Sequence, residues 1–405
     1  MNARRLSWAV LAGSLFLLAV VAAVYVPWHP VPGGPVRDVA ADSLFSTSEL
    51  ARADRYARWA RVWSWSWLAA SLAVSCWLGF TTRGRRIVQR VRGPWWLRVV
   101  AGVALVVLAG RIVALPFAVG ARRHVRDYGL SDQPWPDFAR DQLVAAAVSV
   151  VALSLVMLLL VGSARRWARA WPVAAAGGMA TLVMAGSYVY PVLVEPLFNS
   201  FTPLPASPLR SAVLSLAEQE GVAVDDVLVA DASRRTTTLN AYVSGFGGTR
   251  RVVLYDNLVN DLPEDQALSV VAHELAHAAH DDVLLGSLLG ALGAAAAVGL
   301  LGLLVGGDRL RRSSGVPYLM ALVALGSLLA SPLQNEVSRQ IETRADVAAL
   351  QATQDRAAFV EMQRQLALRA VSDPTPPAWS QLWFGSHPTV LRRVAIAERV
   401  LPDRS

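Results

Sequence analysis

Two histidines four residues apart stand in the stretch 271–280, which reads VAHELAHAAH. On a helix this spacing puts His273 and His277 on one face, one turn apart, where both imidazoles can bind a single zinc ion. Glu274 follows the first histidine and can reach a water molecule in the open position of the metal. This H-E-x-x-H arrangement predicts a metal site in which the glutamate is the general base.

A catalytic zinc site needs a third protein ligand and leaves the fourth position for water. The best candidate is Glu342, in the stretch 338–346, which reads SRQIETRAD. Asp346 lies one turn further along the same helix face, where it can orient a ligand histidine or handle a proton. Together these residues predict a site with two histidines, one glutamate and one Zn²⁺ per chain.

Two other interpretations compete with a catalytic zinc site. The histidines could belong to a surface helix, although three of the six histidines in the chain lie within this short stretch. A structural zinc site is closed by four protein ligands. The sequence provides only His280 and Asp346 as candidate fourth ligands, and neither is well spaced for coordinating the same ion. A zinc hydrolase is therefore favoured.

The composition indicates a membrane protein. Of 405 residues, 54% are hydrophobic and 17% are charged, and the mean hydropathy is +0.39. The single cysteine, Cys76, excludes an internal disulfide and a cysteine-rich zinc site. The net charge of +8 could suggest a nucleic-acid partner. However, the arginines cluster beside apolar runs, which favours the lipid bilayer as partner and no nucleic acid.

Seven apolar runs predict seven transmembrane helices. They cover about 8–26, 62–80, 99–119, 142–162, 172–193, 283–305 and 316–331. We expect the first run to be retained rather than cleaved as a signal peptide, since no small-residue cleavage site precedes Pro27. The last run is expected to continue into the polar helix that carries Glu342. Arg111, inside the third run, is a functional charge, a structural partner or a residue that snorkels near one end of the span.

The chain therefore divides into four predicted parts. Residues 1–193 form a membrane region with five helices, and residues 194–282 form a soluble part with the H-E-x-x-H helix. Residues 283–331 add two membrane helices, and residues 332–405 form a helical part with the third zinc ligand. Strands are expected at 227–230, 240–245 and 251–255, the last after a turn at Gly247-Gly248. The predicted fold is mainly α, with a small β-sheet in the protease part.

Five ordered stretches resemble the integral-membrane zinc metalloproteases typified by CAAX prenyl protease 1. The resemblance extends from about residue 110 to the C-terminal region. Its stretches are EPLFNSFTPLP at 195–205, NAY at 240–242 with RVVLYDNL at 251–258, HELAH at 273–277, SR with E-T-R-A-D at 338–346, and SHP at 386–388 with Arg393. This resemblance implies a gluzincin-like protease domain and a large intramembrane chamber with the zinc site at one end.

The resemblance also implies a role for individual residues. His273, His277 and Glu342 would bind zinc, and Glu274 would activate water. Asp346 is similar to the aspartate that is often assigned as proton donor. His387 and Arg393 would lie near the scissile carbonyl and stabilise the developing oxyanion. Asn240 would belong to an edge strand that pairs with the substrate backbone.

The sequence shows no feature that would recognise the substrate for which this family is named. A prenylated C-terminal motif is the family's named substrate, but nothing in this sequence reads a prenyl group or a cysteine. High alanine and arginine usage is typical of a high-GC bacterium, so we expect the plasma membrane as location. We expect the substrate to be a peptide or protein, either free or bound to the membrane. A quality-control protease for damaged membrane proteins is the alternative within the enzyme class, and a non-enzymatic polytopic protein with a structural zinc is the alternative outside it.

The charge pattern and the resemblance disagree on which side the zinc site faces. With seven spans, the N-terminus and the 81–98, 163–171 and 306–315 loops share one side, which is rich in arginine and poor in acids. The positive-inside rule puts that side in the cytoplasm and the zinc site outside. The eukaryotic members of the family place theirs in the cytosol. For this chain we favour the orientation that the charge count predicts, with the zinc site outside the cytoplasm.

Overall fold

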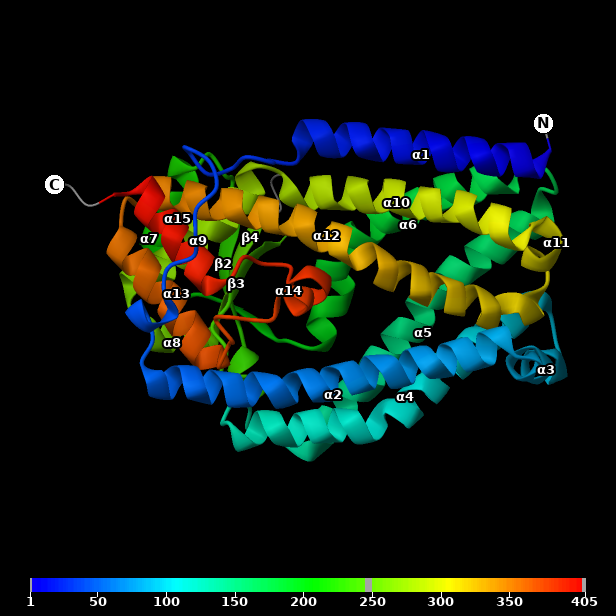
Figure 1. The fold of residues 1–405 in the computed structure, drawn as a ribbon, viewed down its shortest axis with the longest axis horizontal. Helices are drawn as coiled ribbons and strands as arrows, with labels where there is room; N and C mark the ends of the chain where they lie inside the picture. The colour runs from blue at the N-terminus through cyan, green and yellow to red at the C-terminus, as the bar shows by residue number, and fades with distance from the viewer. Residues whose placement is uncertain (1, 245–249, 403–405) are drawn as a thin grey trace.

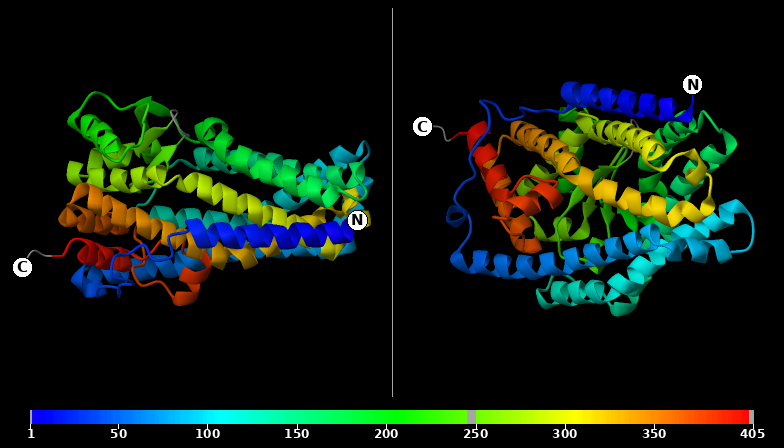
Figure 2. Two further views of the ribbon diagram at one scale, coloured as in Figure 1. Left: turned by 90° about the horizontal axis from the view of Figure 1, so that it is seen from above. Right: turned by 45° about the vertical axis from the view of Figure 1, so that its right-hand side comes forward.

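The computed structural model describes residues 2–244 and 250–402, and long helices running side by side make up most of it (Figures 1 and 2). The long helices are α1 (Ala3–Tyr25), α2 (Thr47–Phe80), α4 (Trp95–Asp127), α5 (Trp135–Arg166), α6 (Trp171–Val189), α10 (Asp282–Val305) and α12 (Val316–Thr353). Each of the seven predicted spans lies on one of them. The chain is a mainly α, multi-span membrane protein.

Six of these helical segments are long and apolar enough to cross a membrane within the described ranges. The exception is α2, whose apolar C-terminal half contains several tryptophans and serines that lower its mean hydropathy. This helix begins at Thr47, well before the predicted start at 62. A capping box explains the early start: Glu49 N–H donates to the Ser46 hydroxyl, and the Glu49 carboxylate accepts from Ser46 N–H.

Small residues let α1 pack closely against α10. A Cβ added to Gly299 would lie 2.7 Å from the backbone nitrogen of Leu11, and one added to Gly302 would lie 3.0 Å from the Ser7 Cβ. Larger side chains at these two glycines would therefore push the helices apart. Close backbone approach through small residues is the usual way in which membrane helices associate.

Helix α12 continues without a break from its apolar half into the polar half that carries Glu342, as the sequence predicts. Pro332 lies inside this helix, at the boundary between its apolar and polar halves. The apolar half packs against α2 and α4, and the polar half packs against α9 (Glu264–Ala279). One rigid element thus reaches from the membrane bundle to the H-E-x-x-H helix.

A four-stranded sheet covers one side of α9, in the strand order β1-β2-β4-β3. The strands are β1 (Phe201–Pro203), β2 (Asp226–Ala230), β3 (Ala241–Ser244) and β4 (Arg251–Tyr255). β2 and β4 are parallel, while β1 and β3 pair antiparallel with them at the two edges. The three predicted strands are confirmed in the described residues, although β3 begins one residue later than predicted and its predicted end, Gly245, lies outside the described residues. β1 was not predicted. The predicted turn at Gly247-Gly248 lies outside the described residues.

The remaining helices are short. They are α3 (Thr82–Arg90), α7 (Pro208–Gln219), α8 (Asp256–Asp261), α11 (Gly307–Leu310), α13 (Arg356–Ala370), α14 (Ala378–Phe384) and α15 (Val390–Val400). The largest cluster of buried apolar side chains joins the sheet, α9, α13, α15 and the last turns of α12. This core holds the metal-motif helices at a fixed distance from each other.

Candidate active site

The two histidines of the H-E-x-x-H motif lie together on one face of α9. His273 is buried and His277 is half-buried. Their Nε2 atoms are 3.1 Å apart. The surrounding helix has buried positions over most of its circumference, so its packing leaves these side chains little freedom. The i, i+4 spacing on a helix produces this arrangement.

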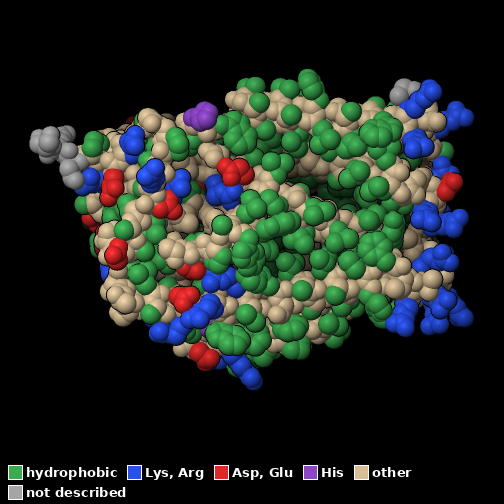
Figure 3. Space-filling view, viewed as in Figure 1, with side chains coloured by type: hydrophobic (Ala, Val, Ile, Leu, Met, Phe, Trp, Pro, Cys, Tyr) green, Lys and Arg blue, Asp and Glu red, His purple; other side chains and the backbone are tan. Residues whose placement is uncertain are grey.

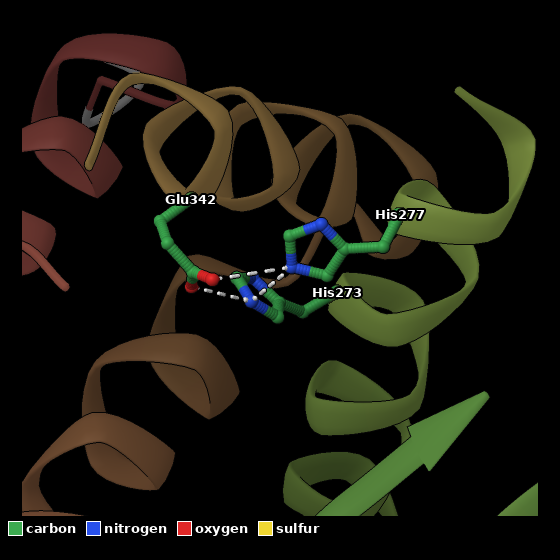
Figure 4. A group of neighbouring side chains, drawn as sticks. All are labelled: His273, His277 and Glu342. Carbon is green, nitrogen blue, oxygen red and sulfur yellow. Dashed lines mark hydrogen bonds and ion pairs between the residues drawn. The ribbon is translucent and has the colours of Figure 1, made fainter. Parts of the chain in front are cut away.

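Glu342 reaches the same point from α12 (Figure 4). One of its carboxylate oxygens lies 3.2 Å from His273 Nε2, and the other lies 3.6 Å from His277 Nε2. The three side chains offer ligand atoms that all lie within 4.8 Å of one another. Residues 69 positions apart in the sequence thus form one cluster of donor atoms.

A carboxylate lies next to the Nδ1 atom of each histidine. Asp346 Oδ1 lies 3.0 Å from His273 Nδ1, and Asp282 Oδ2 lies 2.9 Å from His277 Nδ1. A carboxylate at Nδ1 places the ring proton on that nitrogen and leaves the lone pair on Nε2. Both lone pairs are therefore directed at the carboxylate of Glu342.

This donor set fits a divalent metal ion. Two imidazole lone pairs and a carboxylate face one another at contact distance, and without a cation between them these acceptors repel. Two histidines and one glutamate are a frequent ligand set of catalytic zinc. In the described part of the chain the cluster contains three such ligands, which leaves a coordination position open.

Two arginines hold the supporting carboxylates. Arg393 donates from Nε to Asp346 Oδ2 at 2.8 Å, and its NH2 group bonds the other oxygen. Arg344 bonds Asp282. Asp346 is fully buried, and both of its oxygens are occupied by Arg393 and His273. This geometry suits Asp346 and Arg393 to orienting His273 rather than to meeting a substrate.

Glu274 faces the cavity beside the cluster. No hydrogen bond or ion pair engages its carboxylate in residues 2–244 and 250–402, so it is open to a water molecule. Burial raises the pKa of the Glu274 carboxyl above its usual value, which suits it to accepting a proton. His387 approaches from the other side, with its Nε2 3.3 Å from Glu342 Oε2 and its Nδ1 2.9 Å from the Ser386 hydroxyl. Its side chain is 59% exposed.

A large apolar cavity leads to this cluster. It has a volume of about 1460 Å³ and runs between α1, α10 and α12, with His273, Glu274 and Glu342 at one end. Most of its other lining residues are leucine, valine, alanine and glycine. Figure 3 shows the surface hollowed between hydrophobic side chains over the bundle. Such a cavity suits a hydrophobic segment of a substrate.

The edge strand β3 borders the same cavity. Asn240, Ala241, Tyr242 and Val243 all line it. The Tyr255 N–H donates to the Asn240 carbonyl at 3.0 Å, so this pair is hydrogen-bonded across the ladder. Because hydrogen-bonded and non-hydrogen-bonded pairs alternate, Val243 has its N–H and C=O directed away from β4. These backbone groups can bind an extended peptide.

The sequence did not point to Asp282 as a site residue, and it left the role of Arg111 undecided. Asp282 is the first residue of α10 and five positions after His277, so an acid just beyond the end of the motif helix was the available signal. Arg111 donates to Gln142 Oε1 at 3.4 Å and to the Ser149 hydroxyl at 3.2 Å, which favours a structural role. His280 turns back to the Ala276 carbonyl, away from the cluster.

Two family models match the chain, and together they cover most of it. The model for peptidase family M48 matches residues 203–400. The model for the CAAX prenyl protease N-terminal region, described as five membrane helices, matches residues 44–200. The fold also resembles the crystal structure of S. mikatae Ste24p, with a TM-score of 0.77 at 18% identity. That match covers 97% of this chain and 99% of that one.

Proteins similar to this chain occur in bacteria and plants. The uncharacterized metalloprotease YhfN of Bacillus subtilis (strain 168) is 30% identical over 320 residues, which are 75% of this chain and 74% of the relative. A CAAX prenyl protease 1 homolog of Oryza sativa subsp. japonica is 28% identical over 329 residues, which are 75% and 73% of the two chains. These similarities extend well beyond the H-E-x-x-H motif.

Proposed function

Because this chain belongs to peptidase family M48 and is a membrane metalloprotease, we propose that His273, His277 and Glu342 bind one catalytic zinc ion. The observation that carries this proposal is the convergence of two Nε2 lone pairs and a carboxylate on one point. Glu274, beside them and open to the cavity, is the proposed general base.

A zinc ion held by these ligands would supply Lewis acidity, which acidifies water and polarises the scissile carbonyl. Glu274 accepts the proton of the attacking water and returns it to the leaving amine. His387 donates a hydrogen bond to the oxyanion that develops on the carbonyl. Asp346, enclosed by Arg393 and His273, is proposed to position His273 and not to shuttle protons.

Asp282 is proposed to position His277, because its carboxylate accepts from His277 Nδ1. The Asp282 carboxylate orients the imidazole ring of His277 and raises the basicity of that ring. The substitution Asp282→Ala removes both effects. We expect the variant to bind zinc about 10- to 100-fold more weakly than the wild type. Competition with a chromogenic chelator measures this affinity.

Asp281→Asn provides the matched control for Asp282→Ala. Asp281 is the neighbouring acid, is 61% exposed and pairs with Arg250 rather than with a histidine. The control should retain the zinc affinity of the wild type. Equal affinities in all three proteins would rule out a positioning role for Asp282.

The substrate is proposed to bind along β3 as an additional strand. Val243→Pro removes one outward N–H from this edge but no hydrogen bond of the ladder, and proline is tolerated on edge strands. Losing one backbone hydrogen bond to the substrate should raise KM roughly five- to tenfold with little change in kcat. Steady-state cleavage of a fluorogenic peptide gives both constants.

Val243→Ala is the control for this edge. It shortens the side chain but keeps the N–H, so its KM should stay near that of the wild type. If Val243→Pro and Val243→Ala raise KM equally, the side chain and not the backbone contacts the substrate.

The substrate class has two candidates. Several relatives are named CAAX prenyl proteases, which makes a prenylated C-terminal peptide one candidate. The wide apolar cavity also suits a hydrophobic segment of a damaged membrane protein, which is the quality-control alternative. Purified protein in detergent should be incubated with a farnesylated peptide, its unprenylated counterpart and casein. Cleavage restricted to the farnesylated peptide would support prenyl processing, cleavage of casein would support quality control, and no cleavage of any would contradict both.

We place the protein in a bacterial plasma membrane, with the arginine-rich end of the bundle in the cytoplasm. The blue side chains at the right-hand end of Figure 3 support this orientation, since α3 and α11 lie there and α9 lies at the opposite end. Alkaline phosphatase fused after Ser405 should then be active. Activity only of a cytoplasmic reporter at the same position would reverse the orientation.

A further inference from the structure

A second pocket lies at the end of the bundle opposite the three proposed zinc ligands. It has a volume of about 480 Å³ and forms where the end of α3, the start of α4, the end of α5 and the α10–α12 connection meet. Four arginines and a single aspartate contribute to its wall, namely Arg98, Arg165, Arg311, Arg312 and Asp308. Figure 3 shows this end of the molecule covered by positively charged side chains.

Backbone carbonyls hold three of these arginines in place. Arg98 Nε donates to the Val91 carbonyl at 3.1 Å, and Arg311 Nε donates to the Ala164 carbonyl at 2.9 Å. Arg165 donates to the Arg311 carbonyl at 3.1 Å, and its guanidinium lies 5.3 Å from the centre of the Trp95 ring. These contacts fix the guanidinium groups around the pocket without neutralising them.

The positive charge of the pocket is poorly compensated. Asp308 is 93% exposed and lies 3.9 Å from Arg311. In the described ranges, Arg98, Arg165 and Arg312 have no carboxylate partner. Convergent like charges repel, and a bound anion relieves that cost. The positive-inside rule accounts for arginines on this side of the bundle, but not for their convergence on one pocket.

The donor chemistry matches a phosphate group. Guanidinium groups form paired hydrogen bonds with phosphate oxygens, and the hydroxyls of Ser313 and Ser314 add further donors in the same wall. The exposed rings of Trp96 and Trp167 flank these helix ends, and tryptophan gathers at the level of lipid headgroups. We propose that this pocket binds a phosphate group, supplied by the headgroup of an anionic lipid or by free phosphate.

Native mass spectrometry of the full chain in detergent tests the proposal. Wild type is mixed with phosphatidylglycerol, with phosphatidylcholine or with inorganic phosphate, and bound adducts are counted. The test variant is Arg165→Gln/Arg312→Gln, and the control is Arg90→Gln/Arg92→Gln. The control removes the same charge from exposed arginines on the same side that do not line the pocket.

We expect one tightly held phosphatidylglycerol in the wild type, at least about tenfold weaker binding in the test variant, and binding within roughly twofold of wild type in the control. Adducts with inorganic phosphate that show the same dependence on the variants would identify free phosphate as the source, and adducts with the lipid alone would identify the headgroup. Equal losses in both double variants would show non-specific surface attraction and overturn the site. Unchanged binding in the test variant would overturn it as well.

Arg312→Gln alone keeps this test independent of folding, because the side chain of Arg312 is exposed and carries no hydrogen bond in the described structure. It should weaken phosphatidylglycerol binding while its elution in size-exclusion chromatography stays that of the wild type. Wild-type affinity in Arg312→Gln would remove this arginine from the site and contradict the proposed donor set.

Discussion

Glu274→Gln should lower peptide cleavage by about 10²- to 10⁴-fold, which is the usual contribution of a general base. Glutamine has nearly the same shape as glutamate but cannot accept the proton of the attacking water. Glu274 borders the cavity beside the histidine pair and is not one of the three proposed ligands, so zinc content should stay at one per chain. Single-turnover cleavage and metal analysis of the same preparation measure both quantities.

A second substitution on α9 separates catalysis from helix packing. Glu264 lies in the first turn of this helix, is exposed and is remote from the cluster. Glu264→Gln should cleave peptide at the wild-type rate. Retention of wild-type turnover by Glu274→Gln would refute the assignment of Glu274 as base, and loss of zinc from it would show that its carboxylate contributes to metal binding instead.

Glu342→Ala should weaken zinc binding by more than about 100-fold, since even the loss of a partner that only supports a ligand costs roughly 10- to 100-fold. Without this carboxylate, only His273 and His277 remain in the cluster, and two imidazoles cannot fill a three-ligand site. Cleavage should fall with zinc occupancy and recover partly in excess zinc. Equilibrium dialysis followed by metal analysis gives the affinity.

Glu336→Gln is the control for Glu342→Ala on the same helix. Glu336 bonds Arg339 and Gln340 and lies outside the cluster. The control should bind zinc as the wild type does. If Glu342→Ala retained full zinc affinity, α12 would not supply the third ligand, and the proposed site would be wrong.

The local motifs could be predicted because their geometry follows from helix periodicity. His273 and His277 must share a face at a spacing of four residues, and Glu342 and Asp346 must do so on their own helix. The sequence could not show which histidine each carboxylate supports, because that depends on how α9, α10 and α12 pack. Asp282 was missed for this reason, although it follows the motif helix closely.

The fold shows the same division between local and distant information. Long apolar runs predict the membrane helices, since burying a helix in lipid needs only composition and length. β1 is a strand of three residues that ends at Pro203, too short for an alternating pattern. The start of α2 was readable from Ser46 and Glu49, but its polar first half has no apolar run. The sequence also shows arginines on one side of the bundle, but not that four of them converge on a pocket.

The central claim is that α9 and α12 together hold one catalytic zinc ion. Diffraction from crystals of the full chain, measured above and below the zinc absorption edge, tests it most directly. We predict one anomalous peak per chain, about 2.0–2.2 Å from His273 Nε2, His277 Nε2 and a carboxylate oxygen of Glu342. The fourth position should be free of protein ligands. A peak elsewhere, or one closed by a fourth side chain such as His280, would contradict the catalytic site.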